Sequence, residues 1–386
     1  MTTPTSSAQI VVIGGGVVGA AVLHELAHRG VDAMLIEAEP DVAYAASGTN
    51  SGILHTGFDS TPGELETAMI LRSAELRPAV MRALGVPVMH AGARLVPKRD
   101  SDHETVRALA DNATRNGVDV EIRASDGALL VPGEHVTDPV AYTRALVASA
   151  EAAGAVVRTA ARVVGMEDAG SRLHVRLADG AVIECELVVN AAGLRADDIA
   201  RMIGDASFEI YARKGEFFVF ELPGGTLLDH ILLPVPTPRT KGVLVFPTLD
   251  GRVVAGPTAH DQDDKDDWSV RPAAAAEILP KAFAQLPALE GLTPVASYAG
   301  LRPAGRDANY IIETSTADAR LINVAAIRST GLSASLGIAE RVAELAGARV
   351  AVGERRAATP TDLEPARSPW WRRTAERRAP GVEVAS

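Results

Sequence analysis

Residues 46–63, ASGTNSGILHTGFDSTPG, gather side chains that often take part in chemistry. One histidine, His55, and one asparagine, Asn50, stand among four glycines and several serines and threonines. The segment follows neither the period of a helix nor that of a strand, and it is too polar to build a hydrophobic core. We therefore expect a functional loop, whose role depends on the elements before and after it.

The residues before this loop predict a dinucleotide site. Residues 9–13 and 32–37 have the pattern of two buried parallel strands, joined by a glycine turn and a helix that runs to about His28. The turn has the G-x-G-x-x-G spacing, which allows a tight bend, close approach to a pyrophosphate and close helix packing. The helix N-terminus offers N–H groups to the phosphates, and Glu37 ends the second strand where a ribose hydroxyl would bind. The glycines of this motif are Gly14, Gly16 and Gly19. The acid at the end of the second strand favours FAD or NAD over NADP. The alternative is a glycine turn that binds no ligand.

The rest of the chain alternates helices, strands and glycine turns. Helices are expected at residues 67–83, 101–116, 139–153 and 272–285, the third with Asp138 as its N-cap. A hairpin turned by residues 178–180 leads into a strand that ends in NAAG, a second strand-to-helix glycine turn. Residues 210–257 predict a separate antiparallel sheet that covers a pocket, and Gly331 marks a last glycine turn before a closing helix.

Length and composition narrow the class of protein. The 386 residues suggest two domains, or one domain with a large insertion. A formal net charge of −11 and an aromatic content of 4% disfavour binding to nucleic acid. The single cysteine, Cys185, excludes an internal disulfide and is expected as a half-buried thiol in a strand. We expect no metal site, because the acidic residues within 260–270 lack the spacing of a calcium loop.

The two ends of the chain carry further expectations. The first residues lack the charged and apolar regions of a signal peptide, and no run approaches the roughly 20 apolar residues of a membrane span. A cytoplasmic protein is therefore the default. Residues 350–386 are rich in arginine and proline and are predicted to be a flexible tail. The WWRR stretch in this tail, residues 370–373, leaves open a peripheral contact with a membrane or a protein partner.

The combination of three motifs resembles a known family. VVIGGGVVGAAVLHELAHRG, NAAG about 180 residues later, and RSTGLSASLGIAERVAEL together resemble the FAD-dependent oxidoreductases of the D-amino-acid oxidase superfamily, over about residues 8–347. Within it, ASGTNSGILHTGFDSTPGELET, ARKGEFFVFE, GVLVFPTLDGRVVAGPTAHDQDDKDD and INVAAIRSTGLSAS look most like glycerol-3-phosphate dehydrogenase-like proteins. Relatives that oxidise L-2-hydroxyglutarate carry a similar NSGxxHxG segment.

The resemblance implies a fold and a cofactor. The fold class is mixed α/β, with a discontinuous Rossmann-like FAD-binding domain and an inserted antiparallel-sheet substrate domain. The FAD-binding domain would comprise residues 8–80, 132–205 and 296–349, and the substrate domain residues 81–131 and 206–295. The resemblance also decides FAD over NAD, which the first glycine motif leaves open.

The resemblance assigns roles in the site as well. His55 would accept the hydroxyl proton of the substrate, unless it only bonds the loop. Arg302 would grip an anionic group, while Arg328 and Lys214 are weaker substrate-binding candidates that could instead form structural ion pairs. Gly52 and Gly57 would allow close approach of the cofactor. The expected FAD-binding residues are Gly14, Gly16, Gly19, Glu37, Ser47, Thr49, Asn50, Ser51, Ala192, Gly193, Gly331 and Leu332.

The activity implied is oxidation of a small anionic secondary alcohol by hydride transfer to flavin. The first choice is sn-glycerol 3-phosphate, which becomes dihydroxyacetone phosphate, because Asp59 stands where many hydroxyglutarate relatives have tyrosines. L-2-hydroxyglutarate or another 2-hydroxy acid, and amine or amino-acid oxidation, are alternatives. A non-enzyme alternative is an FAD-binding subunit of a larger dehydrogenase complex. The electron acceptor stays open among oxygen, a quinone and a protein, because the chain has no cysteine-rich C-terminal extension.

Overall fold

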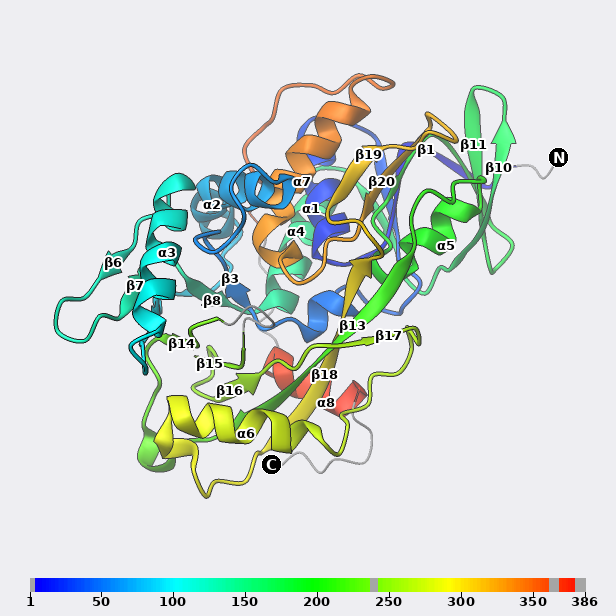
Figure 1. Ribbon diagram of the computed structural model, residues 1–386. Coiled ribbons are helices and arrows are strands. Elements are labelled where there is room, and N and C mark those ends of the chain that lie inside the picture. Colours follow the sequence, from blue (N-terminus) through cyan, green and yellow to red (C-terminus); the bar gives the residue numbers. More distant parts are fainter. Residues whose placement is uncertain (1–3, 237–241, 361–367, 379–386) are drawn as a thin grey trace.

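The computed structural model describes residues 4–236, 242–360 and 368–378, and its elements build two large sheets with helices packed against both (Figure 1). The first sheet lies at the upper right of Figure 1, and the second extends across the lower part and the left. A small three-stranded sheet pairs with neither of them and is formed by β3 (Ile53–Leu54), β8 (His135–Thr137) and β4 (Val88–Met89).

The first sheet is parallel at its centre. β1 pairs in parallel with β12 and with β2, and the residues of β1 from Ile10 to Val12 are fully buried. Strands that are covered on both faces need apolar side chains throughout, which explains the unbroken IVVI run. Along one path the order is β10 (Val163–Ala169), β11 (Arg172–Leu177), β12 (Val182–Asn190), β1 (Ser6–Ile13), β2 (Ala33–Ile36) and β9 (Val156–Arg158), with β20 (Leu321–Ala325) beside β12 and β19 (Ile311–Thr314) beside β20.

The turn between β1 and α1 (Val17–His28) depends on glycine. Gly14 has a φ of +113°, and a Cβ there would lie 2.4 Å from the backbone oxygen of Ala191. A Cβ on Gly19 would lie 1.9 Å from the backbone oxygen of Gly14, so the helix packs directly on the turn. The predicted unit of strand, glycine turn, helix and strand is confirmed.

Helices cover both faces of the first sheet. On one face α1 packs with α2 (Leu65–Ala83), α4 (Pro139–Ala152) and α7 (Gly331–Ala346) around one apolar core. On the other face α5 (Ala196–Arg201) packs against side chains of β1, β12, β10 and β11 in a second core, which also buries Cys185. The predicted N-cap of α4 is confirmed, since the Asp138 side chain accepts from the backbone nitrogens of Val140 at 2.8 Å and Ala141 at 2.9 Å.

The second sheet is antiparallel except where β5 pairs with β14 in parallel. β13 forms its longest ladder, with β18 along one edge and with β17 and β16 along the other. The strands are β17 (His260–Gln262), β13 (Ile210–Phe220), β16 (Val253–Gly256), β15 (Leu244–Pro247), β14 (Ile231–Leu233), β5 (Ala93–Leu95), β7 (Leu129–Val131), β6 (Glu121–Ile122) and β18 (Ala296–Gly305).

The alternation of side chains along β13 separates two cores. Phe218 and Phe220 face α6 (Ala274–Gln285), whereas Phe217 and Val219 face a core shared with α3 (Asp102–Arg115). Short 3₁₀ turns complete the fold: η1 (Ala46–Thr49), η2 (Gly193–Arg195), η3 (Pro223–Gly225) and η4 (Pro287–Leu289).

Two details of the predicted domains differ from the structure. β18 pairs with β13 from residue 296 to residue 305, so this strand belongs to the second sheet and the boundary predicted at residue 296 comes one strand too early. The apolar pattern of β18 fits a buried strand in either sheet, and only its strand pairing shows to which sheet it belongs. The second sheet is also not purely antiparallel, and residues 260–262 of the expected acidic loop form β17.

The C-terminal segment also differs from the flexible tail expected there. Trp370 starts helix α8 (Trp370–Arg378), and only 3% of this tryptophan and 4% of Trp371 are exposed. Burial of two large aromatic side chains against the second sheet stabilises the helix, so these residues do not form a free surface for a membrane or a partner. Residues 361–367 and 379–386 of the expected tail lie outside the described residues.

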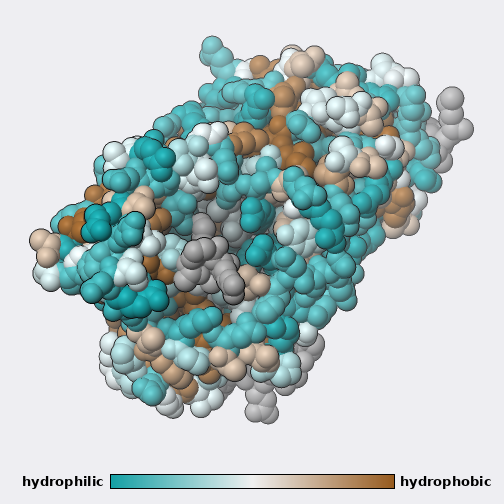
Figure 2. Space-filling model, in the orientation of Figure 1, coloured by the Kyte–Doolittle hydropathy of each residue, from teal (hydrophilic) through white to brown (hydrophobic). Residues whose placement is uncertain are grey.

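The surface on the face shown in Figure 2 is largely hydrophilic, with apolar patches between the polar residues. Within the described ranges, none of the helices combines the length and the apolar character needed to cross a bilayer.

Candidate functional site

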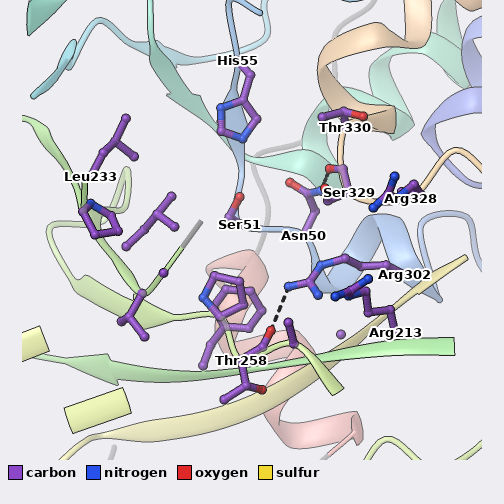
Figure 3. Close-up of a pocket in the computed structure, with 18 of the residues that line it drawn as sticks. Asn50, Ser51, His55, Arg213, Leu233, Thr258, Arg302, Arg328, Ser329 and Thr330 are labelled. Atoms are coloured by element: carbon purple, nitrogen blue, oxygen red, sulfur yellow. Dashed lines mark hydrogen bonds between the residues drawn. The ribbon is translucent and has the colours of Figure 1, made fainter. Parts of the chain in front are cut away.

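A cavity of about 660 Å³ lies where the loop after η1 meets the second sheet and the loop before α7 (Figure 3). One side is polar and carries the predicted site residues. The opposite side is apolar and comes from the second sheet and α3. The lining includes Asn50, Ser51, His55, Arg213, Thr258, Arg302, Arg328, Ser329 and Thr330 on the polar side, and Leu95, Leu109, Leu233, Leu244 and Phe246 on the apolar side.

His55 points into this cavity and is oriented by a buried carboxylate (Figure 3). Its Nδ1 lies 2.8 Å from Oε2 of Glu134, a residue with 0% exposure. A carboxylate accepts hydrogen bonds, so Nδ1 carries the proton in the neutral ring and Nε2 carries the lone pair. Since the two nitrogens lie on opposite sides of the ring, Nε2 is directed away from Glu134.

The network behind His55 holds both partners in place. The second oxygen of Glu134 accepts from the backbone nitrogen of Thr56 at 2.7 Å and from its hydroxyl at 2.9 Å. The His55 backbone is fixed as well, since its nitrogen donates to Oγ of Ser333 at 2.8 Å and its oxygen accepts from Nη2 of Arg77 at 2.9 Å. Burial lowers the pKa of the Arg77 guanidinium. The imidazole is thus pre-organised from both its ring and its backbone.

Three arginines bring positive charge to another wall of the cavity. Arg213 and Arg302 are opposite each other on paired strands, and Figure 3 shows their guanidiniums side by side, with Arg328 close by. Arg302 donates to the backbone oxygen of Thr258 at 3.2 Å, and Arg213 lies 3.5 Å from the carboxylate of Asp261. Like charges this close repel, so the cluster favours an anionic ligand between them.

The surroundings of Arg302 lower the pKa of its guanidinium. Burial is the largest cause, followed by the charges of Arg213 and Arg328, and together they lower its pKa to about 10. An anion bound beside the guanidinium would reverse this effect, because it stabilises the charged form.

Lys214 does not reach the cavity. It is 1% exposed, and its Nζ donates to the carboxylate of Asp267 at 2.7 Å. Successive residues of a strand face opposite sides, so the face of β13 that places Arg213 and Phe217 in the cavity turns Lys214 away from it. The expected substrate-binding role of Lys214 is replaced by a structural ion pair, and Arg213 takes the place in the cavity.

Several residues predicted to bind the dinucleotide are linked by hydrogen bonds around the N-terminus of α1, and we refer to them as the cofactor cradle. The turn of Gly14 and Gly16 meets the N-terminus of α1, where the backbone nitrogen of Val17 donates to Oγ of Ser47 at 2.9 Å. The carboxylate of Glu37 accepts from the backbone nitrogen of Gly15 at 2.5 Å, and burial raises its pKa. A carboxylate beside a glycine turn at a helix N-terminus suits the ribose and the phosphates of a dinucleotide.

The cradle continues into the cavity. η1 and β18 touch at Gly300, where a Cβ would lie 2.8 Å from Oγ1 of Thr49. Asn50 donates to the backbone oxygen of Ser329 at 3.4 Å, which links the loop after η1 to the start of α7 at Gly331. Gly52 has a φ of +78°, which favours glycine there. The small and polar residues on this path fit an extended dinucleotide that runs from α1 to the cavity.

The remaining predicted residues lie on glycine turns at the ends of strands. Ala192 and Gly193 follow β12, and the backbone of Ala191 packs on Gly14. Leu332 is buried in the first turn of α7. Gly57 has a φ of +87°, and a Cβ there would lie 3.3 Å from the side chain of Ile70 on α2. The structure therefore brings Gly14, Ala192 and the first turn of α1 together, as expected for a phosphate site.

Sequence reasoning missed Glu134, Arg213 and Thr258. Glu134 stands in VPGEHVTDP, which matches no motif, so only its full burial identifies it. Arg213 could have been found from the alternation along β13, if the face of that strand that meets the cavity had been known. Thr258 contributes a backbone oxygen, which has no signature in the side-chain sequence.

Comparison with known proteins places the chain in a protein family. A family profile described as FAD dependent oxidoreductase matches residues 9–345. The chain is 29% identical over 353 residues to glycerol 3-phosphate dehydrogenase of Caloramator mitchellensis, a match that covers 87% of this chain and 73% of that protein. It is 27% identical over 266 residues to L-2-hydroxyglutarate dehydrogenase of Escherichia coli (strain K12), which covers 64% of this chain and 63% of that protein.

A solved structure shares the fold. Dithionite-reduced L-alpha-glycerophosphate oxidase from Mycoplasma pneumoniae, with FAD bound, superposes with a TM-score of 0.86 at 23% sequence identity. The match covers 94% of this chain and 100% of that chain. The predicted fold class is confirmed.

Proposed function

The chain belongs to the family of FAD dependent oxidoreductases, and on that premise we propose that it oxidises an anionic secondary alcohol to a ketone. The first candidate substrate is sn-glycerol 3-phosphate, with dihydroxyacetone phosphate as the product. One observation carries the proposal: a histidine oriented by a buried carboxylate and a cluster of three arginines line the same cavity, at the end of the dinucleotide cradle. The similarity to glycerol 3-phosphate dehydrogenase of Caloramator mitchellensis supports it.

FAD, when bound, supplies the acceptor for the hydride that leaves the substrate carbon. His55 then has the complementary task, which is to take the hydroxyl proton through Nε2. Glu134 keeps Nδ1 as the donor of the pair and stabilises the imidazolium that forms, because its negative charge lies 2.8 Å away. The proton therefore moves onto a base whose orientation is fixed before the substrate arrives.

The arginines have a separate task, which is to bind and orient the anionic end of the substrate. A phosphate dianion presents several oxygens, and planar guanidiniums can grip such a group with paired hydrogen bonds. Arg302 and Arg213 approach from paired strands of one sheet, while Arg328 approaches from the loop before α7. The apolar side chains opposite, such as Leu233 and Leu244, make this part of the cavity less polar, which strengthens the charge interactions.

L-2-hydroxyglutarate is the second candidate. Its two carboxylates could divide between the Arg213 and Arg302 pair and Arg328, which comes from a different element. The similarity to L-2-hydroxyglutarate dehydrogenase of Escherichia coli supports this alternative over a shorter part of the chain. Glycerol 3-phosphate is preferred because a single doubly charged group matches a single cluster of cations.

The test compares the two substrates directly. The FAD-bound protein is assayed with an artificial electron acceptor dye, and kcat/KM is measured for sn-glycerol 3-phosphate, L-2-hydroxyglutarate and a panel of amino acids. We expect sn-glycerol 3-phosphate to exceed the others by at least about tenfold, which corresponds to one good charge-assisted contact. A higher kcat/KM for L-2-hydroxyglutarate would reverse the order of the two candidates, and activity with amino acids alone would refute both.

The electron acceptor is tested in the same preparation. Hydrogen peroxide is measured in air with the best substrate, and a soluble quinone is then supplied without oxygen. Peroxide formed in step with substrate consumption would identify oxygen as the acceptor. Turnover with the quinone alone would favour a dehydrogenase.

A further inference from the structure

Helix α8 lies beyond the part of the chain that the family profile matches, yet it contacts the cofactor cradle. The profile ends at residue 345, whereas α8 begins at Trp370. In Figure 1 this helix, coloured red, lies beside β18 of the second sheet, and it also contacts η1. It therefore touches both the sheet that carries Arg302 and the 3₁₀ turn that carries Ser47 and Thr49.

One side of α8 is anchored in the second sheet. Trp370 packs edge-on against Tyr298 with ring centroids 5.6 Å apart. The indole nitrogen of Trp371 donates to both carboxylate oxygens of Asp250, at 3.0 and 3.1 Å. Burial of both tryptophans and the hydrogen bonds of Trp371 fix the position of the helix, so α8 offers a rigid support.

Residues of the same helix also hold the segment of residues 41–48. Arg373 donates to the carboxylate of Asp41 at 3.0 Å and to the backbone oxygen of Ala43 at 3.3 Å. The hydroxyl of Thr374 donates to the backbone oxygen of Gly48. The guanidinium of Arg373 also lies over the ring of Tyr44, with Cζ 5.4 Å from the centroid.

The segment that α8 holds has an unusual shape. Ala43 has a φ of +55°, a conformation that side-chain-bearing residues rarely adopt. A Cβ on Gly48 would lie 2.1 Å from the backbone oxygen of Ala43, so the segment folds back on itself. The bonds from α8 supply partners for carbonyl groups that such a fold leaves outside any ladder. The same shape places Oγ of Ser47 at the N-terminus of α1.

We propose that α8 acts as a clamp that keeps residues 41–48 in the conformation that binds FAD, and that Arg373 is its principal positioning residue. Arg373 bonds Asp41 and Ala43, and in this way it positions Ser47 and Thr49. It does not contact the cofactor itself. The clamp would affect the affinity for FAD, and this effect does not depend on which substrate the protein oxidises. Its failure is therefore distinguishable from failure of the proposed activity.

The test measures the affinity for FAD rather than turnover. Apoprotein is titrated with FAD, and the Kd is read from the change in flavin fluorescence for wild type, Arg373→Met, Arg373→Lys and Thr374→Val. Arg373→Met keeps an unbranched apolar side chain but loses the charge-assisted bonds, and we expect its Kd to rise about tenfold or more. Arg373→Lys can still pair with Asp41 and should recover part of the affinity. The gain in Tm caused by FAD should shrink in the same order.

Arg372→Met is the matched control, because Arg372 pairs with Glu376 on the exposed side of the same helix. Its Kd for FAD should equal that of wild type. If Arg373→Met unfolds, Thr374→Val decides the question, since it removes one hydroxyl and should also raise the Kd. A wild-type Kd in folded Arg373→Met and in Thr374→Val would overturn the proposal, as would an equal loss of affinity in Arg372→Met.

Discussion

His55 is the general base of the proposed reaction, and Glu134 orients its ring through Nδ1. We predict that His55→Asn slows reduction of the flavin by substrate about 10²- to 10⁴-fold, the usual contribution of a general base. The Kd for FAD should stay close to wild type. The measurement is anaerobic stopped-flow absorbance. His260 is the control, since it also lines the cavity but bonds Glu277 at 2.9 Å; an equal loss in His260→Asn would contradict the assignment.

Glu134 is a positioning residue for His55. Glu134→Gln keeps the shape of the side chain but removes the charge, so the imidazolium loses its stabilising partner. We expect the rate of flavin reduction to fall about 10- to 10²-fold while the Kd of the substrate changes little. Stopped-flow traces over a range of substrate concentrations separate the two constants. A change confined to the Kd would show that Glu134 shapes the binding site instead.

Arg302 gives substrate binding an alkaline limit. Its pKa in the free protein is lowered to about 10, so its charge is lost as the pH rises through that value. A bound anion keeps the proton on the guanidinium, so binding above this pH requires uptake of a proton. The Kd of the substrate should therefore rise by about tenfold per pH unit above pH 10. Titrations with and without Arg302→Leu test this, because the variant should bind weakly at all pH values and lack the alkaline rise.

At the scale of elements, two adjacent residues of β13 have different roles, one in the cavity and one in an ion pair. Arg213 faces the cavity and Lys214 pairs with Asp267 on the other side. We predict that Arg213→Met raises KM for the anionic substrate by about tenfold with little change in Tm. Lys214→Met should instead lower Tm by a few degrees and leave KM within about twofold. Steady-state kinetics and thermal unfolding of both variants decide, and the opposite pattern would mean that the faces of β13 are exchanged.

The Lys214 pair also predicts an acid dependence of stability. Hydrogen bonds from Lys214 and Ser269, with the charge of Lys214, lower the pKa of Asp267 to about 2. The folded protein thus binds this proton more weakly than the unfolded chain, so the stabilisation is present above about pH 4 and is lost as the pH falls toward 2. In Lys214→Met the free energy of unfolding should depend less on pH between about 4 and 2. Urea unfolding at several pH values measures it, and an unchanged slope would argue against the pair.

Elements with a strong local pattern were predictable from the sequence, and those defined by pairing were not. The unit from β1 to β2 followed from its buried runs and the spacing of Gly14, Gly16 and Gly19. The place of β18 depends on its partner β13, which lies about 80 residues earlier. α8 carries many charged residues, so composition suggested disorder, whereas burial of Trp370 and Trp371 decides the outcome.

At the scale of the whole molecule, the site is assembled from segments far apart in the chain. His55 follows η1, Glu134 precedes β8, and Arg213 and Arg302 belong to two strands of the second sheet. Motifs located His55, and the resemblance located Arg302, because each stands in a recognisable local sequence. Glu134 and Arg213 become functional only through contacts between segments, which is why the sequence alone did not identify them.

The most direct test of the central claim is an anaerobic titration of the FAD-bound protein with sn-glycerol 3-phosphate, followed by the visible absorbance of the flavin. The account predicts that the band bleaches with formation of one dihydroxyacetone phosphate per flavin, and that His55→Asn bleaches far more slowly. A flavin that stays oxidised with sn-glycerol 3-phosphate and with L-2-hydroxyglutarate, while FAD is plainly bound, would contradict it.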